Sequence, residues 1–187
     1  LRALASGDRV GGIVFNDTEL VNLRPHRSQT QVLRLLHEVV RLNHALTNDD
    51  GAPPTVSLDD ALAAALRRAN HDHLVVLISD LDGADDEIKR LATRIAAHND
   101  VIVVGIYDPL GASLQSQPGM FADTGDERVE LPAHTKFPAA FRDTFARRLD
   151  TWTDVFRALR VPVLPISTAT PPADQLRDLF GKRLKPS

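Results

Sequence analysis

The chain of 187 residues contains no cysteine, and it has only one methionine, one tryptophan and one tyrosine. The lack of cysteine excludes disulfide bonds, thiolate nucleophiles and cysteine-bound metals, and it fits a reducing compartment, so we expect a cytoplasmic protein. A large excess of one charge is also absent, because 22 Lys and Arg stand against 25 Asp and Glu. The resulting net charge of -3 argues against nucleic acid as the main partner, since phosphate binding requires clustered basic residues.

Long apolar segments are missing as well. No run is long enough to cross a membrane, and no signal peptide is apparent. The length favours one globular domain over residues 1–187. The chain starts without methionine, and residues 1–5 resemble the last turn of a helix, which predicts the C-terminal portion of a longer protein.

Short apolar runs alternate with amphipathic segments and predict an α/β protein. The most apolar run, Leu74 to Ser79, predicts a strand buried on both faces, and hence a parallel sheet covered by helices. Residues 9–16 and 20–23 are predicted to form an antiparallel hairpin at the sheet edge. Right-handed crossovers then predict a three-layer, doubly wound Rossmann-like sheet that is mostly parallel. The other expected elements are helices over residues 28–45, 58–69, 85–98, 138–159 and 173–180 and strands over residues 101–107 and 161–166.

Residues 108–132 interrupt this alternation. An irregular loop rich in Pro, Gly, Ser and Gln is followed by two short segments, 121–123 and 128–131, around a Thr-Gly-Asp turn that predicts a hairpin. Long irregular segments at a sheet edge are often functional. We therefore expect residues 108–132 to form an insertion that contacts a partner.

Several carboxylates follow the apolar strand directly, in the order Asp80-Leu81-Asp82-Gly83. Ligands of parallel sheets bind beyond the carboxyl ends of the strands, where such carboxylates could hold a hard cation. In the alternative interpretation, Asp82, Asp85 and Asp86 only turn the chain and cap the next helix. Turn and cap chemistry explains these three residues, so Asp80 is the better candidate for a site.

Four segments, taken in order, resemble the DUF58 proteins: Gly7 to Phe15, Leu74 to Asp80, Val104 to Leu110 and Arg160 to Thr168. Those bacterial proteins of undefined activity are built on a von Willebrand factor A-like domain. The resemblance implies that fold for nearly the whole chain. It also implies an adaptor or assembly role beside a MoxR-type AAA+ ATPase.

The resemblance further implies a metal-ion-dependent adhesion site. Such a site takes Asp-x-Ser-x-Ser after the first strand, a Thr from a second loop and an Asp at a strand end. By position Asp80 matches this Asp, although Leu81 replaces the Gly of many relatives. Thr55 is the best match to the Thr, and Ser57 is the rival. The Asp-x-Ser-x-Ser element is absent from the residues given, so we expect weak or no metal binding here and Mg²⁺ only in a longer chain.

The first strand of the family is absent with that element, which predicts a gap in the sheet. Either the neighbouring strands pair directly, or a second chain fills the slot by strand exchange and forms a homodimer.

Asp80 and Asp82 also resemble the first motif of haloacid dehalogenase-like phosphatases, where the first Asp attacks phosphorus and the second acts as general acid with Mg²⁺. That motif requires next a strand-end Ser or Thr and then a Lys. Here the next strand ends at Asp108, and Lys136 precedes Ser167, so the order is wrong. An interaction module that is not an enzyme is therefore our main hypothesis, and the phosphatase is the alternative.

Three further patterns predict structure only. His71-Asp72-His73 lies before a strand without a third ligand nearby and predicts a solvated loop. Gly11 and Gly12 lie inside a strand and predict close approach of a helix. Trp152 and Phe156 predict core packing, whereas an exposed Trp152 would indicate a partner surface.

Overall fold

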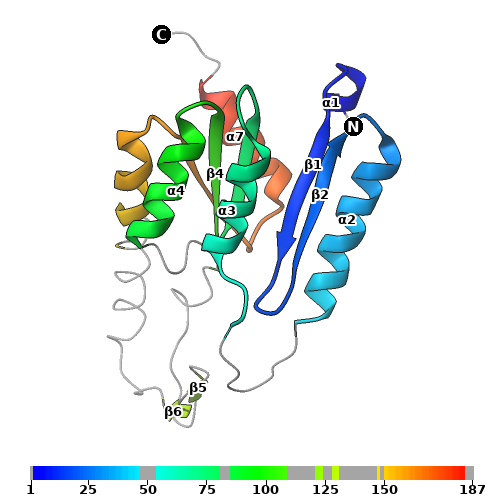
Figure 1. Ribbon diagram of the computed structural model, residues 1–187. Helices are drawn as coiled ribbons and strands as arrows, with labels where there is room; N and C mark the ends of the chain where they lie inside the picture. The colour runs from blue at the N-terminus through cyan, green and yellow to red at the C-terminus, as the bar shows by residue number, and fades with distance from the viewer. Residues whose placement is uncertain are drawn as a thin grey trace.

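The computed structural model describes residues 2–46, 54–80, 85–108, 121–123, 128–130, 147 and 150–183. Strands and helices alternate through most of these segments, as Figure 1 shows. In chain order they are α1 (Arg2–Ala5), β1 (Val10–Phe15), β2 (Leu20–His26), α2 (Gln29–His44), α3 (Leu58–Arg68), β3 (Leu74–Ser79), α4 (Asp86–Ala96), β4 (Asp100–Tyr107), β5 (Phe121–Asp123), β6 (Arg128–Glu130), a helix over residues 150–158, β7 (Val163–Ser167) and α7 (Pro172–Arg183).

The central sheet has the order β3-β4-β7, and both pairs are parallel. Val75 pairs with Val101, and Val104 pairs with Leu164. In Figure 1, α3 and α4 lie in front of this sheet and α7 lies behind it. A parallel sheet between two layers of helices confirms the predicted α/β, Rossmann-like class.

The hairpin of β1 and β2 is antiparallel, as predicted, but it forms a separate two-stranded sheet. Within the described residues β1 does not pair with β3, so the first proposed way of closing the gap, direct pairing of these strands, does not occur. Strand exchange with a second chain stays a prediction. Strands β5 and β6 pair antiparallel, which confirms the predicted second hairpin, whereas its turn lies outside the described residues.

The prediction that β3 is buried on both faces is wrong. Its side chains alternate in exposure, and Leu74, Val76 and Ile78 are 64%, 48% and 62% exposed. Val75 and Leu77 point the other way and pack against the core below α3 and α4. The physical reason is the position of the strand: among the described elements β3 is at the edge of its sheet, and helices cover only one of its faces.

The core lies between the sheet and the helices in front of it. Val103, Trp152 and Phe156 are fully buried, and the two aromatic rings stack with centroids 5.3 Å apart. This arrangement confirms Trp152 as a core residue. The alanine-rich face of α3 also packs inward, because Ala61 and Ala64 are buried.

The hairpin and α2 pack together where the Leu35 side chain lies against Gly12 of β1. A Cβ atom on Gly12 would lie 2.5 Å from Cδ1 of Leu35, so a larger residue at this position would displace that side chain. Leu42 of α2 is 2% exposed, and the side-chain amide of Asn16 donates to its carbonyl oxygen. The predicted role of the Gly11-Gly12 pair is therefore confirmed at Gly12.

Helix starts follow the capping residues that the sequence offers. The hydroxyl of Ser28 accepts a hydrogen bond from the Gln31 N–H at the start of α2. Strand β2 and helix α7 extend beyond the predicted ranges. The loop over residues 48–53 and the start of the predicted helix 138–159 lie outside the described residues.

Candidate functional site

The candidate site lies at the end of the molecule where the parallel strands finish. Asp80 follows the last residue of β3, and Thr55 and Ser57 precede the first turn of α3. Helix α3 packs antiparallel to β3, so its amino end lies at the carboxyl end of that strand, together with the amino end of α4 (Figure 1). The three predicted metal ligands therefore share one end of the molecule, which we name the carboxyl edge.

Thr55 connects the carboxyl edge to the hairpin. Its backbone N–H donates to the carbonyl oxygen of Asp17 at 2.8 Å, and its hydroxyl donates to the same oxygen at 3.3 Å. The Val56 N–H also donates to this oxygen at 3.1 Å. Asp17 lies in the turn between β1 and β2, so this one carbonyl holds the hairpin turn against the start of α3.

Ser57 is the N-cap of α3, and Asp60 completes a capping box with it. The Ser57 hydroxyl accepts from the Asp60 N–H, while Oδ2 of Asp60 accepts from the Ser57 N–H at 3.0 Å and from the hydroxyl at 3.1 Å. Reciprocal bonding of this kind satisfies two N–H groups that the helix leaves unpaired. The Ser57 hydroxyl thus has a complete structural role without a metal.

The described carboxylates that follow β3 differ in their contacts. Asp85 is the N-cap of α4, and its Oδ1 accepts from the Ile88 N–H at 2.9 Å. The cap interpretation of Asp85 is therefore confirmed. Asp80 is exposed, and Oδ1 accepts from the Ser79 hydroxyl at 3.4 Å. Asp82, the second residue of the phosphatase hypothesis, lies outside the described residues.

Asp59 was not singled out from the sequence, yet it is the most unusual carboxyl group of the carboxyl edge. Its Oδ1 atom is buried and has no hydrogen-bond partner. Partial burial raises the pKa of this carboxyl, and the nearby charges of Asp85, Glu87 and Asp60 raise it further. The Ser57-to-Asp60 capping box was the available sequence signal, because it places Asp59 in the first turn of α3 beside the start of α4.

The residues of the carboxyl edge do not fit a magnesium ion by themselves. The Thr55 hydroxyl donates to a backbone carbonyl, and the Ser57 hydroxyl is part of the capping box. Within the described segments, no three His, Asp or Glu side chains come together in a way that could hold a metal. Hard cations require several oxygen ligands in one shell, and the described residues of the carboxyl edge do not provide that arrangement for Mg²⁺.

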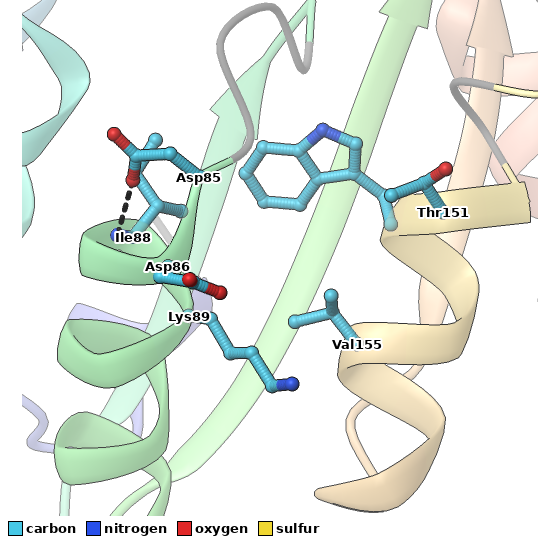
Figure 2. A pocket seen from close by; sticks show the side chains of 7 residues that line it. Asp85, Asp86, Ile88, Lys89, Thr151 and Val155 are labelled. Atoms are coloured by element: carbon cyan, nitrogen blue, oxygen red, sulfur yellow. Dashed lines mark hydrogen bonds between the residues drawn. The ribbon is translucent and has the colours of Figure 1, made fainter.

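A cavity of about 370 Å³ opens beside the carboxyl edge, between α4 and the helix over residues 150–158. In Figure 2, Asp86 and Lys89 of α4 lie opposite Thr151 and Val155 of the other helix. Its wall combines charged groups near the start of α4 with apolar surface. Such a recess can take one large side chain of a partner.

The opposite end of β3 holds the other candidate cluster. His71 and Asp72 form a pair at 2.7 Å, and their side chains are 75% and 90% exposed. This exposure confirms the solvated loop that the sequence predicts.

No helix in the described part of the chain combines the length and the apolar character needed to cross a bilayer.

The parallel sheet, its covering helices and the convergent carboxyl edge define an α/β protein of Rossmann-like architecture. Residues 1–151 match the model of one protein family, described as protein of unknown function DUF58. The chain therefore belongs to the DUF58 family. Neither a curated protein nor a solved structure matches it.

Proposed function

We propose that this chain is a von Willebrand factor A-like interaction module that works with a MoxR-type AAA+ ATPase. It acts by binding at the carboxyl edge, and it performs no catalysis. Two features support this proposal: membership of the DUF58 family, and an edge where separate parts of the chain present charged groups beside a recess.

The observation on which the proposal depends most is the surplus of negative charge at the carboxyl edge. Asp59, Asp80 and Asp85 lie at this edge, and the pKa of Asp59 is raised by burial and further by the negative charge of neighbouring carboxylates. A partner that brings Lys or Arg to the carboxyl edge relieves this repulsion and forms charge-assisted hydrogen bonds. The surface of the partner that binds the carboxyl edge is therefore basic. One of its side chains enters the recess between α4 and the helix over residues 150–158.

Hydrogen bonds hold the helix starts of the carboxyl edge in place. Thr55 is bonded to the hairpin turn, Ser57 caps α3 and Asp85 caps α4. Preorganised surfaces lose less conformational entropy on binding than mobile ones. Direct contact through charges needs no metal, which agrees with the poor fit of the edge to Mg²⁺.

The test is binding of the purified chain to a MoxR-type ATPase from the same organism, measured by biolayer interferometry. Asp80→Asn removes one exposed charge of the carboxyl edge without touching a cap, and we expect it to weaken binding at least several-fold. The matched control is Asp72→Asn at the opposite end of β3, which should bind as the parent does. Equal binding by both variants, or none by the parent, would contradict the proposal.

The phosphatase alternative has its own assay. Hydrolysis of para-nitrophenyl phosphate in the presence of Mg²⁺, lost on Asp80→Asn, would replace the binding module by an enzyme. We expect no hydrolysis above that of a blank.

A further inference from the structure

We draw no further inference here: the strongest candidate, the edge of β3 that faces away from β4 with its exposed Leu74, Val76 and Ile78, restates the gap in the sheet that the DUF58 resemblance implies, and nothing in the described residues shows what covers it.

Discussion

The two ends of β3 differ in how completely their polar groups are satisfied. At the amino end, the side chain of Asn99 donates to the carbonyl oxygens of Ala69 and Ile95 and accepts from the His73 N–H. At the carboxyl edge, Asp59 keeps a buried oxygen without a partner. The amino end is organised for stability, whereas the carboxyl edge retains unfavourable charge that a partner can relieve.

Helix and strand ends meet at Asn99. Its bonds connect the end of α3, the end of α4 and the residue before β3, and the Asp100 N–H adds a bond to the His73 carbonyl oxygen at 2.9 Å. A single side chain thereby connects the ends of three elements. The carboxyl edge has no such shared side chain among the described residues; its caps are separate.

The largest predicted effect on stability is at the amino end. Asn99→Ala removes three hydrogen bonds and should lower the free energy of unfolding by about 2 kcal/mol, measured by urea denaturation. Asn99→Asp keeps the acceptor for His73 but loses both donated bonds, so its loss should approach that of alanine. A change below about 0.5 kcal/mol in the free energy of unfolding for both variants would mean that the hydrogen bonds of Asn99 contribute little to stability.

Much of the fold could be predicted from the sequence because local signals agreed with tertiary packing. Ser28 and Asp85 have the side chains that helix starts require, and the structure uses both as N-caps. Leu74 to Ser79 was predicted as a strand from its apolar run, and its bounds are confirmed. These elements are specified by residues close to one another in the chain.

The rest depends on contacts between distant segments. The apolar run of β3 gave no sign that one face would be exposed, since hydrophobicity does not reveal which helices cover a strand. The sequence indicated that Asp80, Thr55 and Ser57 would share an edge, but it could not show that both hydroxyls are occupied by Asp17 and Asp60. Asp59 was missed because its burial and its proximity to Asp85 arise only in the folded chain.

A smaller loss is predicted for the caps of the carboxyl edge. Ser57→Ala breaks the capping box of α3 and should cost about 1 kcal/mol in the free energy of unfolding. Ser57→Asp restores an N-cap acceptor and serves as the matched control. A larger loss in the free energy of unfolding for Ser57→Ala than for Asn99→Ala would contradict the view that the amino end of β3 contributes more to stability than the carboxyl edge.

Asp59→Asn should produce a small gain in stability that depends on pH. Burial and neighbouring carboxylates raise the pKa of Asp59 in the folded state, so ionisation of this carboxyl opposes folding at neutral pH. Replacement by a neutral amide removes that penalty. The gain should shrink as the pH falls through the raised pKa and vanish below the ordinary value of 3.8, where the carboxyl is protonated in both states. Thermal denaturation of the parent and the variant across this pH range measures the gain in stability. A gain that increases towards acid pH would contradict the prediction.

The smallest effect on stability is expected for Asp80→Asn. The amide oxygen of asparagine can accept from the Ser79 hydroxyl as the exposed carboxylate does, so the urea midpoint should remain within experimental error of the parent. Asp80 is proposed to act in binding, whereas Asn99 stabilises the fold at the other end of β3. A large loss of stability would assign Asp80 a structural role and remove the contrast between the two ends.

The proposal that the carboxyl edge is the binding surface is tested most directly by hydrogen–deuterium exchange of the chain with and without a MoxR-type AAA+ ATPase. We predict that the ATPase slows exchange over residues 55–60 and 85–89, next to Asp80. Protection over residues 71–73 and 98–100 instead, or no protection in either segment, would contradict the account.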